Sequence, residues 1–335
     1  MKKYDIIGDI HGYGGPLKEL LVRLGYEERD GCYRHTGRTA IFLGDFIDRG
    51  PEIPEVLRLI RAMVENGAAL AVMGNHEYNA ICFHTQDKHG GHLRSHTEDN
   101  GKNVRQHQAT LTQFVERPEE WAGYLAWFRT LPLYLDLSGL RIVHACWDAE
   151  QISQLGSMRL TDELLFKAAE PASPEGKAID ILLKGKELSL PEESTFTDKE
   201  GIVRKQIRVK WWLGAEKQTY RSLSLPDSED APRISVPVHH HAEIGNAYPQ
   251  SDPPVFVGHY WLPPKRPEAL ASNVACVDYS IAQAGGLLVA YSWDGEDKID
   301  REKFTWVSRE NPGFLVGMEA SLSGSAPLFR TQETG

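Results

Sequence analysis

The sequence contains no uninterrupted apolar stretch near the roughly 20 residues that a membrane-spanning helix needs. Its first residues, MKKYDIIGDI, turn acidic at Asp5 instead of continuing as an apolar leader. Only four cysteines occur, and no two of them form a CxxC pair, so neither a disulfide framework nor a thiolate zinc site is indicated. These absences predict a cytoplasmic protein that does not associate with a membrane.

Positive charge is also scarce. The 37 Lys and Arg residues stand against 47 Asp and Glu residues, which gives a formal net charge of −10. Proteins that coat nucleic acids carry a surplus of basic residues, so long RNA or DNA is not expected as a partner. The 335 residues can bury a large core, and their number fits either two domains or one large α/β domain with a long insertion.

The first 80 residues repeat one pattern three times. A short apolar run, at 4–7, 40–43 or 70–73, ends in a Gly-Asp or Gly-Asn turn, and a segment with helical character follows. Short apolar runs bounded by glycine are typical of buried strands in an α/β sheet. The pattern therefore predicts β-α-β units whose polar turns lie at the carboxyl ends of strands, where open α/β sheets bind ligands.

Later parts of the chain add strands and an insertion. Four further apolar runs predict strands at 140–143, 255–257, 274–277 and 287–291, the later ones antiparallel. Between His144 and His259 the chain has many prolines and no sustained periodicity, which indicates a cap or insertion over 145–255. A single domain is expected over 1–310, and residues 311–335, rich in Ser, Gly and Pro, are expected to form a loosely held tail.

Five of the turns after predicted strands carry oxygen or imidazole side chains. Asp, His and Asn without cysteine are ligands for moderately hard divalent metals such as manganese, iron or zinc. The candidate ligands are Asp9, His11, Asp45, Asn75, His144 and His259. Six such groups are too many for one tetrahedral ion, and they predict two ions that share a carboxylate.

The motifs GDIHG at 8–12, GDFIDRG at 44–50 and GNHE at 74–77, followed by single histidines at 144 and 259, resemble those of the calcineurin-like metallophosphoesterase superfamily. Within it, the chain is similar to the branch of serine/threonine phosphoprotein phosphatases and bacterial diadenosine tetraphosphatases. The resemblance covers roughly the first 150 residues and the stretch 253–293. It implies an α/β (α+β) fold, a four-layer α-β-β-α sandwich of the metallophosphoesterase type with a long insertion.

The resemblance also implies roles for individual residues. It implies a first metal site with Asp9 and His11, a bridging Asp45, and a second site with Asn75, His144 and His259. A hydroxide that bridges the two ions would attack the phosphorus in line. His76 would be the general acid toward the leaving alkoxide, and Asp48 would orient its imidazole. Arg49 would bind phosphate oxygens through its guanidinium fork.

A basic segment at 201–221 is a candidate for a second phosphate contact. It holds six basic groups against one acid, and apolar and basic residues alternate in it as they would along a strand. Arg208 or Arg204 could reach a phosphate oxygen while the apolar face packs inward. The alternative is a solvated basic strand over buried tryptophans.

The stretch 84–107 holds five histidines after the third turn. Most of them are expected to face solvent in a mobile loop. Because this loop follows the predicted metal ligand Asn75, it is also a candidate substrate lid.

The leading functional prediction is a phosphatase with two divalent ions, manganese being the expected metal and iron or zinc the alternatives. Its expected substrates are phosphomonoesters, with phosphoserine and phosphothreonine peptides among the candidates. Asp48 favours this prediction, because the tetraphosphatases tend to lack an aspartate there. The single histidine of the Gly258-His259-Tyr260 turn likewise favours the phosphoprotein phosphatase branch.

Two alternatives remain open at this point. The first is a hydrolase of nucleotides or dinucleoside polyphosphates, which would need the 145–255 insertion to supply a base-stacking pocket. The candidate residues for that pocket are Trp211, Trp212, Tyr220 and Tyr248. The second is an inert binding scaffold, against which the intact His76 and Asp48 argue. The oligomeric state is not indicated by the sequence.

Overall fold

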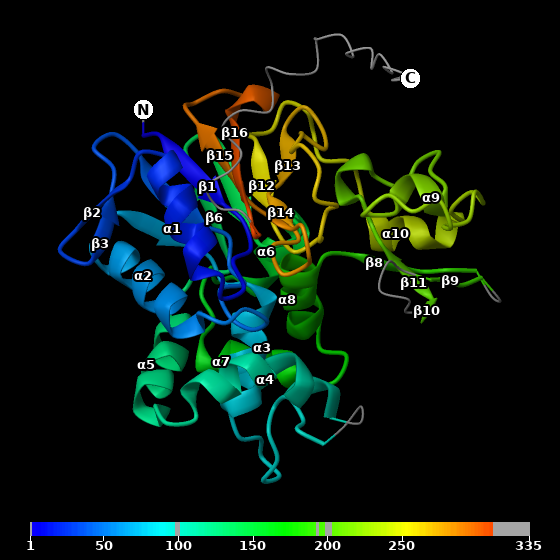
Figure 1. Cartoon of the computed structure of the whole chain (residues 1–335). Helices are drawn as coiled ribbons and strands as arrows, with labels where there is room; N and C mark the ends of the chain where they lie inside the picture. The colour runs from blue at the N-terminus through cyan, green and yellow to red at the C-terminus, as the bar shows by residue number, and fades with distance from the viewer. Residues whose placement is uncertain (1, 98–100, 192–193, 198–202, 311–335) are drawn as a thin grey trace, which may run out of the picture.

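The apolar runs of the sequence form the strands of two sheets (Figure 1). The computed structural model describes residues 2–97, 101–191, 194–197 and 203–310. The first sheet has the order β14-β15-β1-β4-β5, with β16 paired to β15, and the second has the order β13-β12-β7-β6. The strands of these sheets are β1 Tyr4–Ile7, β4 Thr39–Phe42, β5 Ala69–Ala71, β6 Tyr134–Leu137, β7 Leu140–Val143, β12 Val255–Val257, β13 Val274–Cys276, β14 Asp278–Tyr279, β15 Leu287–Trp293 and β16 Phe304–Ser308.

Strand directions follow from the connections between strands. β1, β4 and β5 are parallel because a helix crosses over between successive strands. β15 is antiparallel to β1, as predicted. β13, in contrast, lies parallel to β12, so the antiparallel direction predicted for 274–277 is wrong. The long connection 258–273 returns the chain to the starting end of β12, which is the crossover that parallel pairing requires.

Amphipathic helices cover these sheets. α1 contacts β15 and β16, whereas α2 contacts β5. The leucine spacing of α1 buries Leu17, Leu20 and Leu21 completely, and Gly25 takes a left-handed φ of 86° just past the helix end. The α-helices are α1 Gly14–Arg23, α2 Ile53–Glu65, α3 Asn75–His84, α4 Lys102–Phe114, α5 Pro118–Phe128, α6 Ala149–Leu155, α7 Asp162–Ala169, α8 Pro174–Lys184, α9 Tyr220–Leu223 and α10 His241–Ile244. None of the described helices is both long and apolar enough to cross a membrane.

The two sheets share one hydrophobic core. Ile6 and Phe42 of the first sheet and Phe256 of the second are completely buried. The rings of Phe256 in β12 and Tyr291 in β15 lie 4.8 Å apart between centroids, so the sheets face each other directly. The predicted α/β sandwich is therefore confirmed.

The chain between β7 and β12 has two distinct parts. α6, α7 and α8 pack into the main core, where Leu165, Ile179 and Leu182 are completely buried. The described residues among 187–244, here called the side lobe, surround a separate small core that includes Leu188 and Leu223. The lobe projects beside the sheets in Figure 1. Its strands are β8 Glu187–Ser189, β9 Phe196–Thr197, β10 Val203–Arg204 and β11 Gln206–Arg208.

A small hairpin completes the strands of the described chain. β2 Glu27–Arg29 and β3 Cys32–Arg34 pair antiparallel between α1 and β4. Short 3-10 helices lie at Trp211–Leu213, Val238–His240 and Arg301–Lys303. The predicted tail, 311–335, lies outside the described residues.

Candidate metal centre

Turns after five strands of the two sheets converge on one point. Two glycines permit this close approach. Gly44, at φ 91°, has no room for a side chain, because a Cβ there would lie 2.3 Å from the backbone nitrogen of Gly74. A Cβ on Gly258 would lie 2.1 Å from Oδ1 of Asp9. The turn motifs of the sequence are thus required by the packing of one turn against another.

Asp45 lies between two groups of ligand-type side chains. Its Oδ2 is 3.7 Å from Nε2 of His11, and its Oδ1 is 3.4 Å from Nε2 of His144. One group holds His11, Asp45 and His76, and the other holds Asp45, His144 and His259. Within each group the ligand atoms lie within 4.8 Å of one another, so the carboxylate of Asp45 is shared.

Asn75 and Asp9 complete the cluster. Oδ1 of Asn75 lies 3.0 Å from Nε2 of His144 and 2.8 Å from Nδ1 of His259. Oδ2 of Asp9 accepts a hydrogen bond of 3.0 Å from the backbone N–H of His259. All six predicted ligands therefore meet at this site, although their role as ligands remains a prediction.

Several ligand atoms have no hydrogen-bond partner although they are buried. They are Oδ1 of Asp9, Nε2 of His11 and Nε2 of His259. A buried polar atom without a partner costs about 1–3 kcal/mol, which a bound ion would offset. The arrangement thus fits divalent metal ions.

Backbone carbonyls select the imidazole nitrogens that face the site. Nδ1 of His11 donates to the carbonyl of Ile47 at 2.9 Å, and Nδ1 of His144 donates to that of Leu43 at 2.6 Å. A carbonyl can only accept, so Nδ1 carries a proton, and in the neutral ring Nε2 then has the lone pair. That lone pair is what a metal ion binds.

Negative charge is also concentrated in the site. Burial raises the pKa of Asp9 well above its ordinary value, and the carboxylates of Asp278 and Asp45 raise it further. Burial likewise raises the pKa of Asp278. Carboxylates that disfavour one another's ionisation in this way are stabilised by cations, which agrees with a site for two divalent ions.

Backbone strain gathers at the same place. Ten non-glycine residues of the described chain have a positive φ, and six of them belong to this site. The six are His11, Asp45, Asp48, Arg49, His259 and Trp261. Such conformations cost of order 1–3 kcal/mol each and persist where surrounding contacts fix them, a situation common at functional sites.

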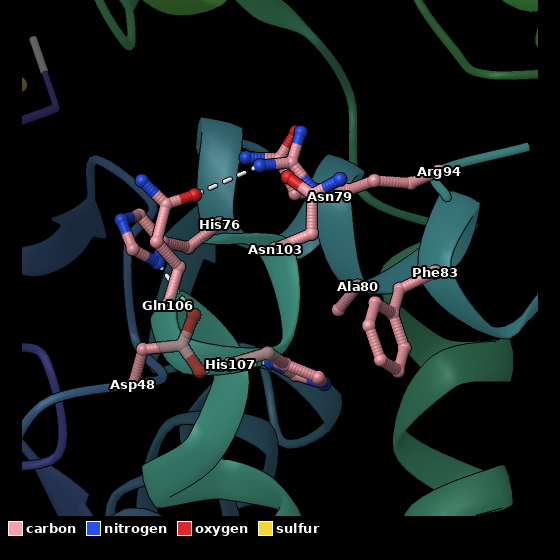
Figure 2. A pocket seen from close by; sticks show the side chains of 9 residues that line it. All are labelled: Asp48, His76, Asn79, Ala80, Phe83, Arg94, Asn103, Gln106 and His107. Atoms are coloured by element: carbon pink, nitrogen blue, oxygen red, sulfur yellow. Dashed lines mark hydrogen bonds and ion pairs between the residues drawn. The ribbon is translucent and has the colours of Figure 1, made fainter. Parts of the chain in front are cut away.

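His76 and Asp48 form a close pair beside the ligand cluster (Figure 2). Nδ1 of His76 lies 2.6 Å from Oδ2 of Asp48, so its Nε2 is directed to the side of Asp45 at 3.9 Å. Burial alone would lower the pKa of His76, but the carboxylates of Asp45 and Asp48 raise it above the ordinary value. The pair therefore favours a protonated imidazole, as general acid catalysis needs.

One face of α4 holds Asp48 and the turn that follows it. Oδ1 of Asp48 accepts hydrogen bonds from Thr110 Oγ1 at 2.5 Å and His107 Nδ1 at 2.9 Å. One turn further along, Gln113 donates to the carbonyl of Gly50 and accepts from the N–H of Ile53. The spacing of three residues places these side chains on the same face of the helix.

The expectation of solvent-facing histidines in a mobile loop at 84–107 is wrong for His107. It lies in α4, is buried and contacts Asp48. Burial would raise the pKa of Asp48, but the hydrogen bonds from His107 and His76 hold it below its usual range. Neither His107 nor Thr110 belongs to a motif, and only a helical reading of 102–114 could have found them.

Arg49 is held by a residue that sequence reasoning did not single out for a role. Its guanidinium lies 4.2 Å from the ring centroid of Trp261, a cation–π contact. Trp261 also lies beside His11, with ring centroids 6.0 Å apart. The backbone N–H of Trp261 donates to Asp278 Oδ2. Trp261 thus positions Arg49 at the edge of the site.

The two other predicted phosphate contacts differ in position. Arg208 is half-buried at the end of β11. Burial lowers the pKa of His259 most, and the positive charge of Arg208 is the next largest cause of that lowering. Arg204 lies exposed in β10, which pairs only with β9 of the side lobe. The structure thus brings Arg208 but not Arg204 toward the cluster.

The aromatic residues suggested for a nucleotide pocket are not available for stacking. Trp211, Trp212 and Tyr220 are all buried. Trp211 donates to the carbonyl of Ala145, and Tyr220 belongs to the small core of the side lobe. Tyr248 is committed to Arg141 and to the carbonyl of Pro253. Trp211, Trp212 and Tyr220 therefore offer no open ring face to a base.

This fold and this cluster define a metallophosphoesterase. The family model for calcineurin-like phosphoesterases matches residues 2–215. The chain belongs to this family of metal-dependent phosphoric ester hydrolases.

The chain is also similar to individual proteins of known name. It is 32% identical over 153 residues to the asymmetrical bis(5'-nucleosyl)-tetraphosphatase PrpE of Oceanobacillus iheyensis, covering 43% of this chain and 55% of that protein. It is 30% identical over 189 residues to the PrpE of Bacillus subtilis, covering 52% and 70%. A protein serine/threonine phosphatase structure from Saccharomyces cerevisiae is 12% identical, covering 92% and 79%, with a TM-score of 0.46. The chain thus spans only about half of the first of these relatives.

The contact between α4 and Asp48 can be tested with Thr110→Val. Valine keeps the shape but removes the hydroxyl that donates to Asp48, so we expect kcat to fall about tenfold while both metal ions are retained. Steady-state kinetics on an aryl phosphate, with metal content measured by atomic spectroscopy, would check this. Thr110→Ser should restore activity, and Gln108→Ala, on the exposed face of α4, is the control. An unchanged kcat in Thr110→Val would contradict a positioning role.

The cation–π contact can be tested with Trp261→Ala. Loss of a contact of about 0.5–2 kcal/mol should raise KM about three- to tenfold by freeing Arg49, with a smaller effect on kcat. Trp261→Phe retains an aromatic face and should lie between the wild type and Trp261→Ala. Equal KM values for all three proteins would show that Arg49 does not depend on this ring.

Proposed function

We propose that this protein is a dinuclear-metal hydrolase that cleaves phosphoanhydride bonds in dinucleoside polyphosphates. The shared carboxylate of Asp45, with a ligand group on either side and the His76–Asp48 pair alongside, carries the proposal of phosphoryl hydrolysis. Similarity to two bis(5'-nucleosyl)-tetraphosphatases supports the substrate class. These relatives favour the nucleotide alternative over the phosphomonoesterase that the sequence motifs first suggested.

The six predicted ligands would hold two divalent ions, with manganese as the expected metal. When bound, such ions acidify an attacking water and neutralise charge on the phosphoryl oxygens. His76 would give the proton on Nε2 to the leaving oxygen, while Asp48 accepts from Nδ1 and fixes the ring. Arg49 and Arg208 would orient the phosphoryl group through their guanidinium N–H groups.

Phosphomonoester hydrolysis is a second candidate activity. An alkoxide leaves reluctantly without a proton, and the buried pair His76 and Asp48 is suited to supply one. Thr110 and His107 hold the carboxylate of Asp48 in place by hydrogen bonds, which supports a role for the pair in protonating an alkoxide. Small phosphomonoesters and phosphopeptides therefore remain proposed substrates beside nucleotides.

The substrate class can be tested by comparing three substrates. Metal-stripped protein is reconstituted separately with manganese, zinc and magnesium and assayed on diadenosine tetraphosphate, a phosphothreonine peptide and an aryl phosphate. We expect the highest kcat/KM for diadenosine tetraphosphate, with manganese the most effective metal. Preference for the peptide would overturn the nucleotide proposal in favour of a protein phosphatase. Inactivity on all three with both metals bound would support a scaffold.

The role of His76 can be tested with His76→Asn. We expect metal binding to persist and alkyl phosphates to be slowed about 10²–10⁴-fold, because their leaving groups need the proton. Activated aryl phosphates should be slowed far less. The measurement is kcat/KM across leaving groups of increasing basicity, and equal slowing of all of them would exclude His76 as general acid.

A further inference from the structure

Arg49 faces a second space besides the metal cluster. It lines an open groove of about 690 Å³, here called the Arg309 groove, together with Tyr13, Glu52, Thr112, Gln113 and Arg309. The groove runs between the turn at 49–52, the start of α1, α4 and the end of the first sheet. We propose that it binds the nucleoside phosphate portion of the substrate that extends away from the scissile phosphate. This inference rests on the proposed function.

The charge of the groove suits a phosphate chain. Arg49 and Arg309 line it, and neither forms an ion pair with a carboxylate in the described part of the chain. Glu52 is the single acidic residue among the lining side chains, and it accepts a hydrogen bond from the N–H of Gly15. The lining thus carries a local surplus of one positive charge on a protein whose formal net charge is −10.

Both arginines are held in place before any ligand arrives. Arg309 donates to the carbonyl of Ala282 at 2.8 Å, and its guanidinium lies 5.0 Å from the ring centroid of Tyr13. Arg49 is held by Trp261. Anchored guanidinium groups lose little conformational entropy on binding, and their remaining N–H groups match phosphate oxygens.

Arg49 links the groove to the metal cluster. Its guanidinium lies against the ring of Trp261, and the centroid of that ring is 6.0 Å from the ring centroid of the predicted ligand His11. One arginine therefore borders both the site of phosphoryl transfer and the groove. A polyphosphate bound at the cluster would enter the groove past Arg49.

Space favours this direction over the other side of His76. The cavity between α3 and α4, lined by His76, Arg94 and Gln106, has about 10 Å³, which is room for one water molecule (Figure 2). The Arg309 groove falls within the range of about 300–1,000 Å³ typical of small-molecule sites. A nucleotide therefore fits only the second of these two spaces.

The groove should recognise phosphate more than the base. Its one aromatic ring, Tyr13, is buried and covered by the Arg309 guanidinium, so no free aromatic face is present for stacking. The polar side chains of the lining include the two guanidinium groups, the hydroxyl of Thr112, the amide of Gln113 and the carboxylate of Glu52. Dinucleoside polyphosphates with adenine or guanine should therefore be cleaved with similar efficiency.

Two variants of the metal-loaded enzyme test the groove. Arg309→Gln removes the charge, and Thr112→Trp fills the space from an exposed position on α4. Each has a matched control outside the groove, Arg301→Gln and Gln108→Trp. We expect each groove variant to lower kcat/KM for diadenosine tetraphosphate about tenfold more than for 4-nitrophenyl phosphate, mainly through KM. The controls should leave this ratio unchanged.

Binding of the non-hydrolysable α,β-methylene analogue of ADP, measured by calorimetry, separates the two proposals. We expect about tenfold weaker binding in both groove variants than in their controls. If the wild type cleaves 4-nitrophenyl phosphate but not the dinucleotide, the proposed function fails while the calorimetry still decides on the groove. Equal analogue binding in Arg309→Gln and Arg301→Gln would overturn the groove proposal, whatever the substrate.

Discussion

The site depends on how the buried carboxylate of Asp45 is held. The backbone N–H groups of Asp45, Phe46 and Gly74 donate to the carboxylate of Glu77, at 2.8, 2.8 and 3.0 Å. Burial, and then the charge of Asp45, raises the pKa of Glu77 to about 7. Two neighbouring buried acids are stable together only with donors and cations around them. Glu77 fixes the turn, and bound cations would stabilise the charge, so metal binding would be coupled to local folding.

The second constraint is the packing of α4 against the turn that carries Asp48 and Arg49. His107 and Thr110 hold the carboxylate of Asp48, and Gln113 holds the backbone after Arg49. The same helix therefore positions His76, the proposed proton donor, through Asp48, and Arg49, the proposed phosphate contact, through Gly50. It also supplies one wall of the Arg309 groove. A segment that carries no recognisable motif thus connects the reaction centre with the proposed nucleotide subsite.

The sequence predicted those parts of the site that depend on local chain geometry. Asp9, Asp45 and Asn75 follow short apolar runs and glycines, and these signals place them at strand ends without knowledge of distant contacts. His107 and Trp261 could not be assigned roles in the same way. Their roles come from contacts with Asp48 and Arg49, 59 and 212 positions away, which only the folded chain brings together.

The same limit explains the errors in the insertion. Trp211 and Tyr220 looked suited to stacking on a base. Both lie near a run of alternating apolar residues, and the folded chain buries them, Tyr220 in the small core of the side lobe. Arg208 and Arg204 lie four residues apart and look equivalent in sequence. Arg208 lies in β11, which pairs with β8, whereas Arg204 lies in β10, which pairs with β9. Only the first arrangement brings an arginine toward His259.

Asp48 need not exclude a polyphosphate substrate. A phosphate leaving group is a weaker base than an alkoxide, so cleavage of an anhydride gains less from the proton of His76 than cleavage of an alkyl ester does. The His76–Asp48 pair therefore widens the range of leaving groups without selecting among them. Selection would then come from contacts beyond the reacting phosphorus, where Arg309 and Arg49 of the proposed groove would bind additional phosphates that a monoester lacks. Acid catalysis and substrate preference thus belong to different side chains that meet at one turn, residues 48–50.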